Sequence, residues 1–245
     1  MCKRTTPDPL LRLFLDRYGL HLLAVPRAGA SVGDVFVSDG RRTSPVGNIR
    51  HLVRPGLELA PHRGEPMADI AGRSTREVGL EAGLGVLEAF LTAIGAAGIV
   101  DAVNARYSHG SARSLAFSFE DPVRDHVDVL EVGAALLDRQ LVAESVFGPG
   151  DHRYYVTTAV ARSRALSVQG RADNRSAMEI GAEVVKVAEA DAAVEVRLGQ
   201  DGKVTYAGKD WLAFGVELFE VLPDSEAGIL RLAMPGGPVS VRGPD

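Results

Sequence analysis

The first apolar stripe of the chain has the spacing of a helix. Leu13 and Phe14 lie three and four residues after Leu10, with Pro9 before the stripe and Gly19 after it. Proline is favoured at the first position of a helix, where no hydrogen bond is lost, and glycine commonly ends one. The pattern therefore predicts an amphipathic helix that begins at Pro9 and ends before Gly19.

Short apolar runs after this helix predict strands. Residues 20–25 and 35–37 are almost continuously apolar, and a proline follows the first run. Runs of this length between turn residues are typical of buried strands. Residues 40–66 are rich in Arg, Pro, Gly and His, so we expect a long irregular connection with one short strand near residues 49–53. Another short strand is predicted at residues 67–71.

The longest predicted helix covers residues 77–97. Its apolar residues recur every three or four positions and so share one face: Leu80, Leu84, Leu87, Leu91 and Ile94. The apolar period then changes to two, as expected for strands. Residues 99–107 and 111–119 flank a Ser-His-Gly turn, which predicts a hairpin. A short helix is predicted at residues 132–141.

The C-terminal half is rich in strand patterns. Residues 153–169 are a very long strand candidate whose two faces both mix apolar with polar residues, which suits a dry core poorly. Residues 177–188 fit a helix or a strand. Further strands are predicted around a turn at Asp201-Gly202, namely residues 192–198, 204–207 and 211–222. Because tight turns join the strands, the predicted fold class is α+β, a twisted, mainly antiparallel central sheet with surrounding helices.

Composition and charge narrow the range of partners. The chain has 245 residues, 46% hydrophobic and 24% charged, as in ordinary globular proteins. A net charge of −5 argues against a nucleic-acid binder. Residues 1–63 hold ten Lys and Arg against five Asp and Glu, while the rest hold 17 against 27. A basic first quarter suits an anionic membrane surface, although chance clustering of arginines would look the same.

The chain has neither the pattern of a secretory signal nor a membrane-spanning helix. Its first residues are polar and interrupted by prolines, and no apolar stretch reaches the ~18 residues that a spanning helix needs. We therefore expect the protein to be made in the cytoplasm and to fold there.

Motifs give little support for an enzyme or a metal site. Residues 29–33 match the G-x-S-x-G nucleophile elbow around Ser31, which requires a strand-to-helix turn. A predicted strand follows instead, so we expect Ser31 to be a loop residue, with a serine hydrolase as an alternative. The six histidines lack zinc-site spacing, and we predict neither a metal nor a catalytic residue.

Cys2 is the only cysteine, and Lys3 and Arg4 follow it. It therefore has no partner for an internal disulfide. A thiol beside two cations has a lowered pKa and is open to acylation, and an acyl chain beside basic residues provides membrane affinity. The alternative is an inert cysteine at a frayed end.

Several segments together resemble a bacterial gasdermin. The matching parts are Cys2, residues 19–27, residues 68–74, the glycine-containing helix after them, residues 112–119 and residues 155–159. The resemblance covers nearly the whole chain and depends on the order and size of the segments rather than on one sharp motif.

The resemblance implies a non-enzymatic pore-forming protein. Residues 1–222 would be the pore-forming body, and residues 223–245 a linker with a C-terminal autoinhibitory peptide. The resemblance further implies that a caspase-like or related protease removes the peptide. The freed cytoplasmic monomer would then oligomerise in the bacterial inner membrane, where hairpins extend into a β-barrel. The cell would die and limit phage spread. The resemblance also implies that a palmitoyl group is attached to Cys2. It implies no other cofactor and no nucleic-acid partner.

Long strands with mixed faces are consistent with a change into membrane strands. A tilted spanning strand needs about 9–11 residues. The strand candidates near or above that length are residues 99–107, 111–119, 153–169 and the region 184–198. The candidate membrane-strand residues are Leu115, Phe117, Phe119, Val156, Val160, Val194 and Val196. An ordinary antiparallel sheet with an exposed edge is the alternative.

The tail after residue 222 has the composition of a detachable segment. A linker-like stretch precedes four apolar residues expected to dock on the body at ~1.5–3 kcal/mol each: Ile229, Leu230, Leu232 and Met234. We expect cleavage between Asp224 and Met234. Asp224 suits a caspase, Arg231 an Arg-specific protease, and Leu230 or Leu232 a protease that prefers leucine. A final strand with a disordered end is the alternative, as is an acyl-anchored lipid- or ligand-binding protein without a removable tail.

Overall fold

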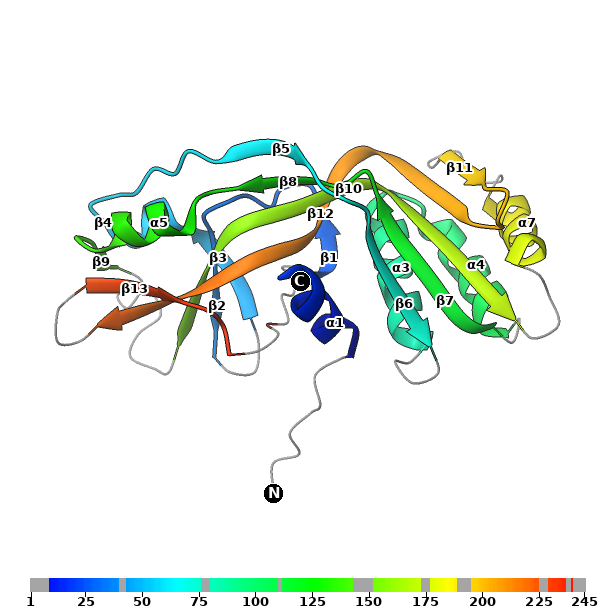
Figure 1. Ribbon diagram of the computed structural model, residues 1–245, viewed down its shortest axis with the longest axis horizontal. Helices are drawn as coiled ribbons and strands as arrows, with labels where there is room; N and C mark the ends of the chain where they lie inside the picture. Colours follow the sequence, from blue (N-terminus) through cyan, green and yellow to red (C-terminus); the bar gives the residue numbers. More distant parts are fainter. Residues whose placement is uncertain are drawn as a thin grey trace, which may run out of the picture.

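Two long antiparallel strands form the spine of the molecule. They are β10 (Arg153–Ala172) and β12 (Val204–Asp224), and they run through both halves of the computed structural model (Figure 1). Their pairing extends from Tyr154 opposite Val221 to Val168 opposite Val204. The structure describes residues 9–39, 43–75, 80–109, 112–142, 152–172, 177–188, 195–224, 229–236 and 239.

Each outer edge of this spine pairs with three shorter strands in turn. Along β10 these are β2 (Asp34–Ser38), β8 (Val123–His126) and β7 (Ala112–Glu120). Along β12 they are β13 (Ile229–Ala233), β1 (His21–Arg27) and β11 (Glu195–Leu198). Outside the first group lie β3 (Thr43–Asn48), β5 (His62–Pro66) and β6 (Ile70–Thr75). Every pairing recorded in the described chain is antiparallel, which confirms the predicted α+β class.

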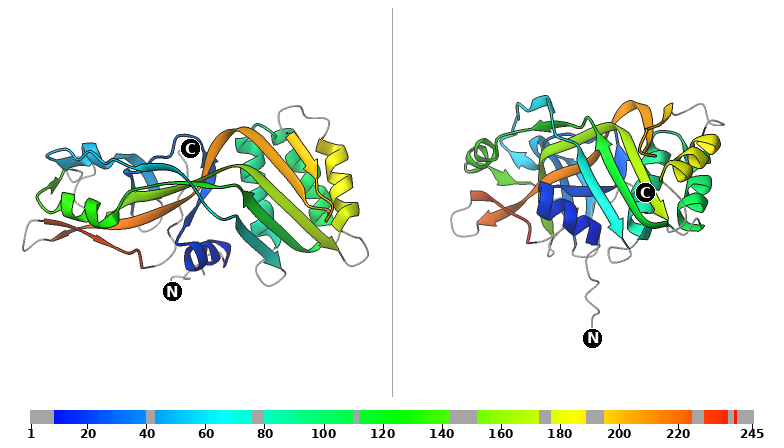
Figure 2. Two further views of the ribbon diagram at one scale, coloured as in Figure 1. Left: turned by 45° about the horizontal axis from the view of Figure 1, so that its top comes forward. Right: turned by 45° about the vertical axis from the view of Figure 1, so that its right-hand side comes forward.

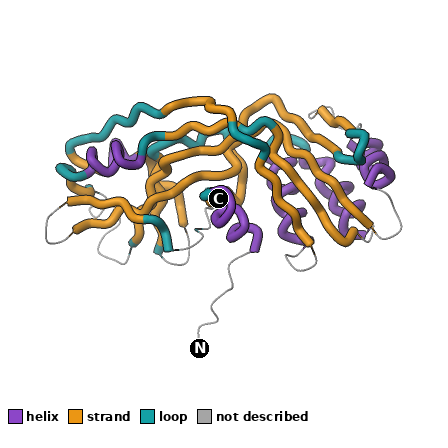
Figure 3. The backbone as a smooth tube through the Cα atoms, viewed as in Figure 1, coloured by secondary structure: helices purple, strands orange, loops and turns teal. Residues whose placement is uncertain are grey.

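Most of the helical residues lie in one half of the molecule. There the sheet carries α3 (Leu80–Ala93), α4 (Ala97–His109) and α7 (Ala177–Ala188), at the right of Figure 3. The other half carries α2 (Ile49–Leu52), α5 (Val129–Leu136) and a small sheet of β4 (Val53–Arg54) and β9 (Gln140–Leu141). Near the centre lies α1 (Pro9–Tyr18), and Figure 2 shows it beneath the sheet.

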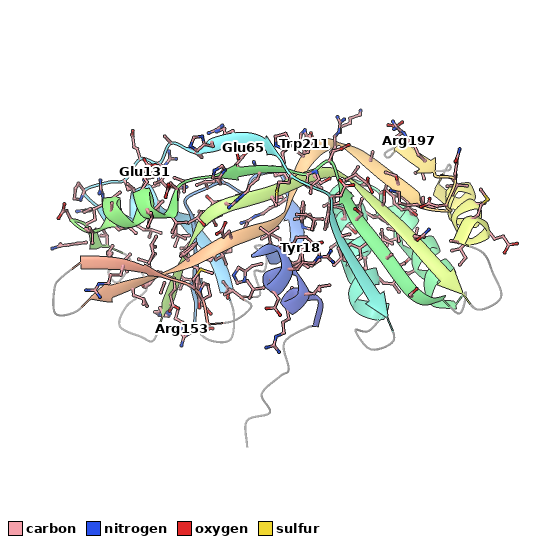
Figure 4. All side chains as sticks on the ribbon, in the orientation of Figure 1. Tyr18, Glu65, Glu131, Arg153, Arg197 and Trp211 are labelled. Atoms are coloured by element: carbon pink, nitrogen blue, oxygen red, sulfur yellow. The ribbon has the colours of Figure 1, made fainter. Side chains whose placement is uncertain are left out.

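The sheet bends where the two halves meet. Ser163 of β10 pairs with Leu212, but Ala165 pairs with Ala207, so four residues of β12 bulge opposite Arg164. One of them is Trp211, labelled at the bend in Figure 4. The buried hydroxyl of Ser163 donates to the carbonyl of Glu120 at 2.7 Å and accepts the N–H of Ala165 at 3.1 Å. The hydroxyl satisfies backbone groups that the irregular pairing leaves free.

Buried side chains of the described residues form three clusters. The first lies beneath α3 and α4 and is rich in aromatic rings, including Phe14, Phe90, Phe117, Phe119 and Phe214. The second lies under α5 and includes Val132, Leu136, Val156, Val221 and Leu230. The third lies around β1 and β2 and includes Leu23, Phe36, Val160, Val216 and Leu218.

Several predicted elements are confirmed with small shifts. α1, β2 and β7 lie where the pattern placed them. The predicted helix at 77–97 ends earlier, at Ala93, because Gly95 adopts a positive φ of 86°. β1 does not end at Pro26 but continues to Arg27 across an irregular register. Residues 177–188, left open between helix and strand, form α7.

The prediction of a strand at residues 99–107 is wrong, because these residues lie within α4. Ile99, Val100 and Val103 are buried at helical spacing. The same residues also fit the alternating pattern of a strand. They form a helix because α4 packs against α3.

The prediction of a long irregular connection at residues 40–66 is also wrong, because this region contains β3, α2, β4 and β5. All five residues of β5 are exposed, so no apolar alternation marks it. Its pairing with β8 and the N–H of Gly64 donating to Asp125 at 2.9 Å hold it in place.

The long strand predicted at 153–169 is confirmed, but it is not poorly suited to a core. All residues from 154 to 161 are buried. Side chains cover both faces, and small or hydroxyl-bearing residues fit between them. Several of the buried hydroxyls have local partners: Ser167 and Thr205 lie 2.6 Å apart, and Thr158 donates to the carbonyl of Glu217, whereas the buried hydroxyl of Thr157 has no partner among the described residues. Mixed faces are thus compatible with burial when the polar groups are bonded.

Candidate functional site

The C-terminal segment docks on the body as a strand. β13 pairs with the last five residues of β12, from Ile229 opposite Asp224 to Ala233 opposite Glu220. β12 therefore continues two residues beyond the boundary expected at residue 222. At the left end of Figure 1, β13 closes an edge of the sheet that β12 would otherwise present to solvent.

The two faces of β13 differ. Leu230 is 3% exposed and belongs to the second cluster, and Leu232 packs partly against the same cluster. α5 packs against β13 from this side. Between the two leucines, Arg231 lies on the exposed face. The expected docking residue Met234 is 68% exposed and buries little, while the side chain of Ile229 lies outside the described residues.

A second contact lies further along the same segment. The backbone N–H of Val239 donates to Nδ1 of His21 at 3.0 Å, and its side chain packs against the third cluster. His21 is 3% exposed, and burial lowers its pKa to about 4. The imidazole is therefore neutral at pH 7, so that Nδ1 has a lone pair to accept this hydrogen bond.

The expected cleavage residues lie in or beside paired backbone. Asp224 ends β12, and Leu230, Arg231 and Leu232 lie within β13. The connection between the strands, residues 225–228, lies outside the described residues. Proteases prefer exposed, unpaired chain. A cut inside β13 would require this strand to leave the sheet first.

The candidate membrane-strand residues are core residues here. Leu115, Phe117 and Phe119 of β7 are buried in the first cluster, beneath the helices. Val156 and Val160 of β10 are buried in the second and third clusters, and Val196 of β11 packs partly against the first. Val194 lies outside the described residues. Within region 184–198, the described parts are the end of α7 and β11 rather than one long strand.

Cys2 lies outside the described residues, but the helix after it is firmly placed. Phe14 of α1 is fully buried, and Leu11 and Leu13 pack partly against the first cluster. The hydroxyl of Tyr18 donates to the carbonyl of Ala71 at 2.8 Å and accepts its N–H at 3.1 Å. Figure 4 shows Tyr18 between α1 and the helical half. α1 is thus anchored on the first cluster.

The surroundings of Ser31 do not form a nucleophile elbow. Ser31 is exposed in the turn between β1 and β2, and no helix follows it. Its backbone N–H donates to Oδ2 of Asp34 at 2.8 Å, and Asn48 contacts the other carboxylate oxygen at 3.4 Å. Burial raises the pKa of Asp34. The G-x-S-x-G match therefore forms a turn, as the sequence predicts.

Neither a metal centre nor a spanning helix is found in the described ranges. No group of three or more His, Cys, Asp or Glu side chains there is placed to hold a metal ion. None of the described helices combines the length and apolar character needed to cross a bilayer.

Sequence reasoning missed two contacts of this region. The bond between Val239 and His21 joins residues 218 positions apart. The only local signal was a histidine among the apolar residues of a predicted strand, which favours burial without naming a partner. It also missed a partly buried ion pair between Arg162 of β10 and Asp125 of β8, in which Arg162 also donates to the carbonyl of Ala30.

Comparisons with known proteins agree with this geometry. A model of the Bacterial Gasdermin Family matches residues 23–228. A gasdermin of Vitiosangium sp. is 26% identical over 223 residues, 87% of this chain and 81% of that protein. One of Bradyrhizobium tropiciagri is 24% identical over 244 residues, 99% of this chain and 91% of that protein. A solved bacterial gasdermin structure from the same organism has a TM-score of 0.67 and 20% identity, with complete coverage of both chains, and shares the fold.

Proposed function

Because the chain belongs to the bacterial gasdermin family, we propose that it is a non-enzymatic pore-forming protein restrained by its own C-terminal segment. A caspase-like or related protease cuts this segment from a cytoplasmic monomer. The freed body oligomerises in the bacterial inner membrane and builds a pore from extended strands. Loss of the membrane barrier kills the cell and limits the spread of phage.

The observation that carries this proposal is the pairing of β13 with the edge of β12. The match to the family model ends at residue 228, and β13 begins at Ile229. The proposed inhibitory segment therefore begins beyond the part of the chain that the family model matches, and β13 lies at a sheet edge. An edge strand presents unpaired N–H and C=O groups that recruit other strands. Covering this edge is a physical means of keeping copies apart.

We expect the contacts of β13 to hold an attached tail and to release a cut one. Burying leucine side chains contributes ~1.5–3 kcal/mol each, and Leu232 is only partly buried beside Leu230. While the chain is intact, the tail binds at a high effective concentration, which cleavage removes. A cut tail therefore dissociates far more readily than an attached one.

The proposed pore also requires the body to open. The rings of Phe117 and Phe119 lie in the first cluster beneath α3. Strands that face lipid through these residues must first lose the helices that cover them. In the closed form, the apolar side chains proposed to face lipid are therefore buried in the core and shielded from water.

Truncation after Asp224 tests the proposal, because it keeps β12 whole and removes β13. We expect the truncated chain to release dye from vesicles of bacterial lipids, while the full chain does not. Intact vesicles after addition of the folded truncated chain would contradict the proposal.

A substitution in the full chain tests the same contact without cleavage. Leu230→Asp places a charge in the second cluster and is expected to make the uncut chain leak dye, approaching the truncated one. Met234→Asp is the matched control, because Met234 is exposed. This variant is expected to release no more dye than the full chain. Leu230→Ala serves if the Asp variant does not fold. Equal leakage of the Leu230 and Met234 variants would contradict the role of β13.

We also propose that Cys2 carries a palmitoyl chain, which adds about 0.8 kcal/mol of membrane affinity per buried methylene. α1, which follows Cys2 in the sequence, packs on the apolar first cluster. Cys2→Ala is expected to weaken killing by the truncated form without changing the free energy of unfolding. Survival of cells expressing matched amounts of each variant measures this effect. Unchanged killing across expression levels would make the lipid dispensable.

A further inference from the structure

We infer that His21 binds Val239, called here the tip of the C-terminal segment. The hydrogen bond between them is a second restraint on this segment, separate from the pairing of β13. The inference rests on the proposed function, since it concerns how the same segment is held. It assigns to His21 a positioning role that follows from where the side chain lies in the sheet.

The two restraints lie end to end on one edge of β12. β13 leaves β12 opposite Glu220, and β1 begins opposite Val216 with His21 itself. Residues 217–219 of β12 separate the two partners on this edge. Val239, six residues beyond the end of β13, meets His21 at the start of β1.

The hydrogen bond to His21 comes from the backbone of Val239 and does not depend on a particular side chain at that position. Nδ1 of a neutral imidazole accepts the N–H of Val239 at 3.0 Å. The side chain of Val239 adds contact with the third cluster, which includes Leu23, two positions further along β1. His21 and Leu23 lie on the same face of β1 because strand residues alternate. The tip thus caps the buried imidazole and shields an apolar patch.

Several charged residues of the elements packed against β1 point away from His21. α1, α3 and β12 pack against β1. Asp16 and Arg17 of α1 and Glu88 of α3 are exposed. Glu217 of β12 pairs with Arg124 at 2.6 Å and, one position from Val216, points to the other face of the sheet from His21.

Two restraints change how a cut releases the segment. A cut at residues 225–228 leaves a fragment that still holds both β13 and the tip, so each contact keeps the other at high effective concentration. A cut beyond β13 frees only the tip. The bond at His21 therefore slows release after the first kind of cut and affects the uncut chain as well.

Three variants and a double change test the inference. His21→Leu removes the acceptor, His21→Asn keeps an acceptor oxygen near the position of Nδ1, and a chain ending at Gly236 removes Val239. A net hydrogen bond of about 0.5–1.5 kcal/mol corresponds to a roughly 2- to 12-fold change. We expect His21→Leu and the shortened chain each to raise dye leakage by the uncut protein by this factor. His21→Asn is expected to match the parent.

Combining His21→Leu with the shortened chain gives a double-mutant cycle. Because the shortened chain already lacks the bond that His21→Leu breaks, the combined chain is expected to leak no more than the shortened chain. Multiplied effects, or leakage equal to the parent for both, would overturn the inference while the chain ending at Asp224 still leaked. If His21→Leu does not fold, His21→Ala takes its place in the cycle, because alanine also removes the acceptor.

Hydrogen exchange separates the inference from the proposed function. The amide of Val239 is expected to exchange roughly 2- to 12-fold faster in His21→Leu than in the parent or in His21→Asn. This holds even if the chain ending at Asp224 proves silent on vesicles, an outcome that would overturn only the proposed function. Equal exchange in all three proteins would overturn the inference itself.

Discussion

Replacing Phe119 by Ala is expected to lower the free energy of unfolding by about 3–5 kcal/mol. The ring is 1% exposed and stacks on Phe214 with centroids 3.8 Å apart. Phe14, Phe90 and Phe117 contact the ring at tilted or perpendicular angles. The change removes both the buried area and the aromatic contacts from three elements that meet there. The residual cavity lies between α1, α3 and the spine, where collapse is difficult.

Denaturant unfolding measures this effect, with Phe119→Leu as the matched control. Leucine keeps most of the apolar volume, so its expected cost is about 1 kcal/mol, well below that of alanine. An alanine variant that loses less than the leucine variant would show that Phe119 is not central to this cluster. The result also bears on pore formation, because it measures what holds a candidate lipid-facing residue in the closed form.

Local patterns were sufficient where one face of an element is apolar and its neighbours are close in sequence. The stripe from Leu10 to Phe14 predicted α1, and the alternation from Leu115 to Phe119 predicted β7. In both, burial against one cluster imposes the period that the sequence displays. The docking of Leu230 was predicted in the same way, since an apolar run beyond a polar linker requires cover.

Patterns failed where partners far away in the sequence decide the conformation. Ile99 and Val103 fit both a helix and a strand, and contact with α3 selects the helix. β5 has no apolar residue to bury and exists because β8 offers it a backbone edge. The tip contact at His21 has the same origin, because a backbone N–H leaves no trace in the sequence.

Replacing Asp125 by Leu is expected to lower the free energy of unfolding by about 1.5–3 kcal/mol, because it removes the carboxylate that pairs with the partly buried guanidinium of Arg162. Asp125 pairs with Arg162, and their side chains are 16% and 15% exposed. It also accepts the N–H of Gly64, so one carboxylate joins β5 and β8 to the spine. These contacts lie close to the bend, where β7 gives way to β8 along β10.

The double variant Asp125→Leu with Arg162→Met separates the charge from the packing. Replacing a buried ion pair by apolar residues of similar volume is often neutral, so the double variant is expected to recover most of the loss. Asp125→Asn is expected to lie between, because it keeps an acceptor for Gly64 but loses the charge. Denaturant unfolding of the parent, Asp125→Leu, Arg162→Met and the double variant measures the coupling. A double variant less stable than Asp125→Leu alone would contradict this expectation. Packing of β5 and β8, rather than the charge pair, would then stabilise the sheet near the bend.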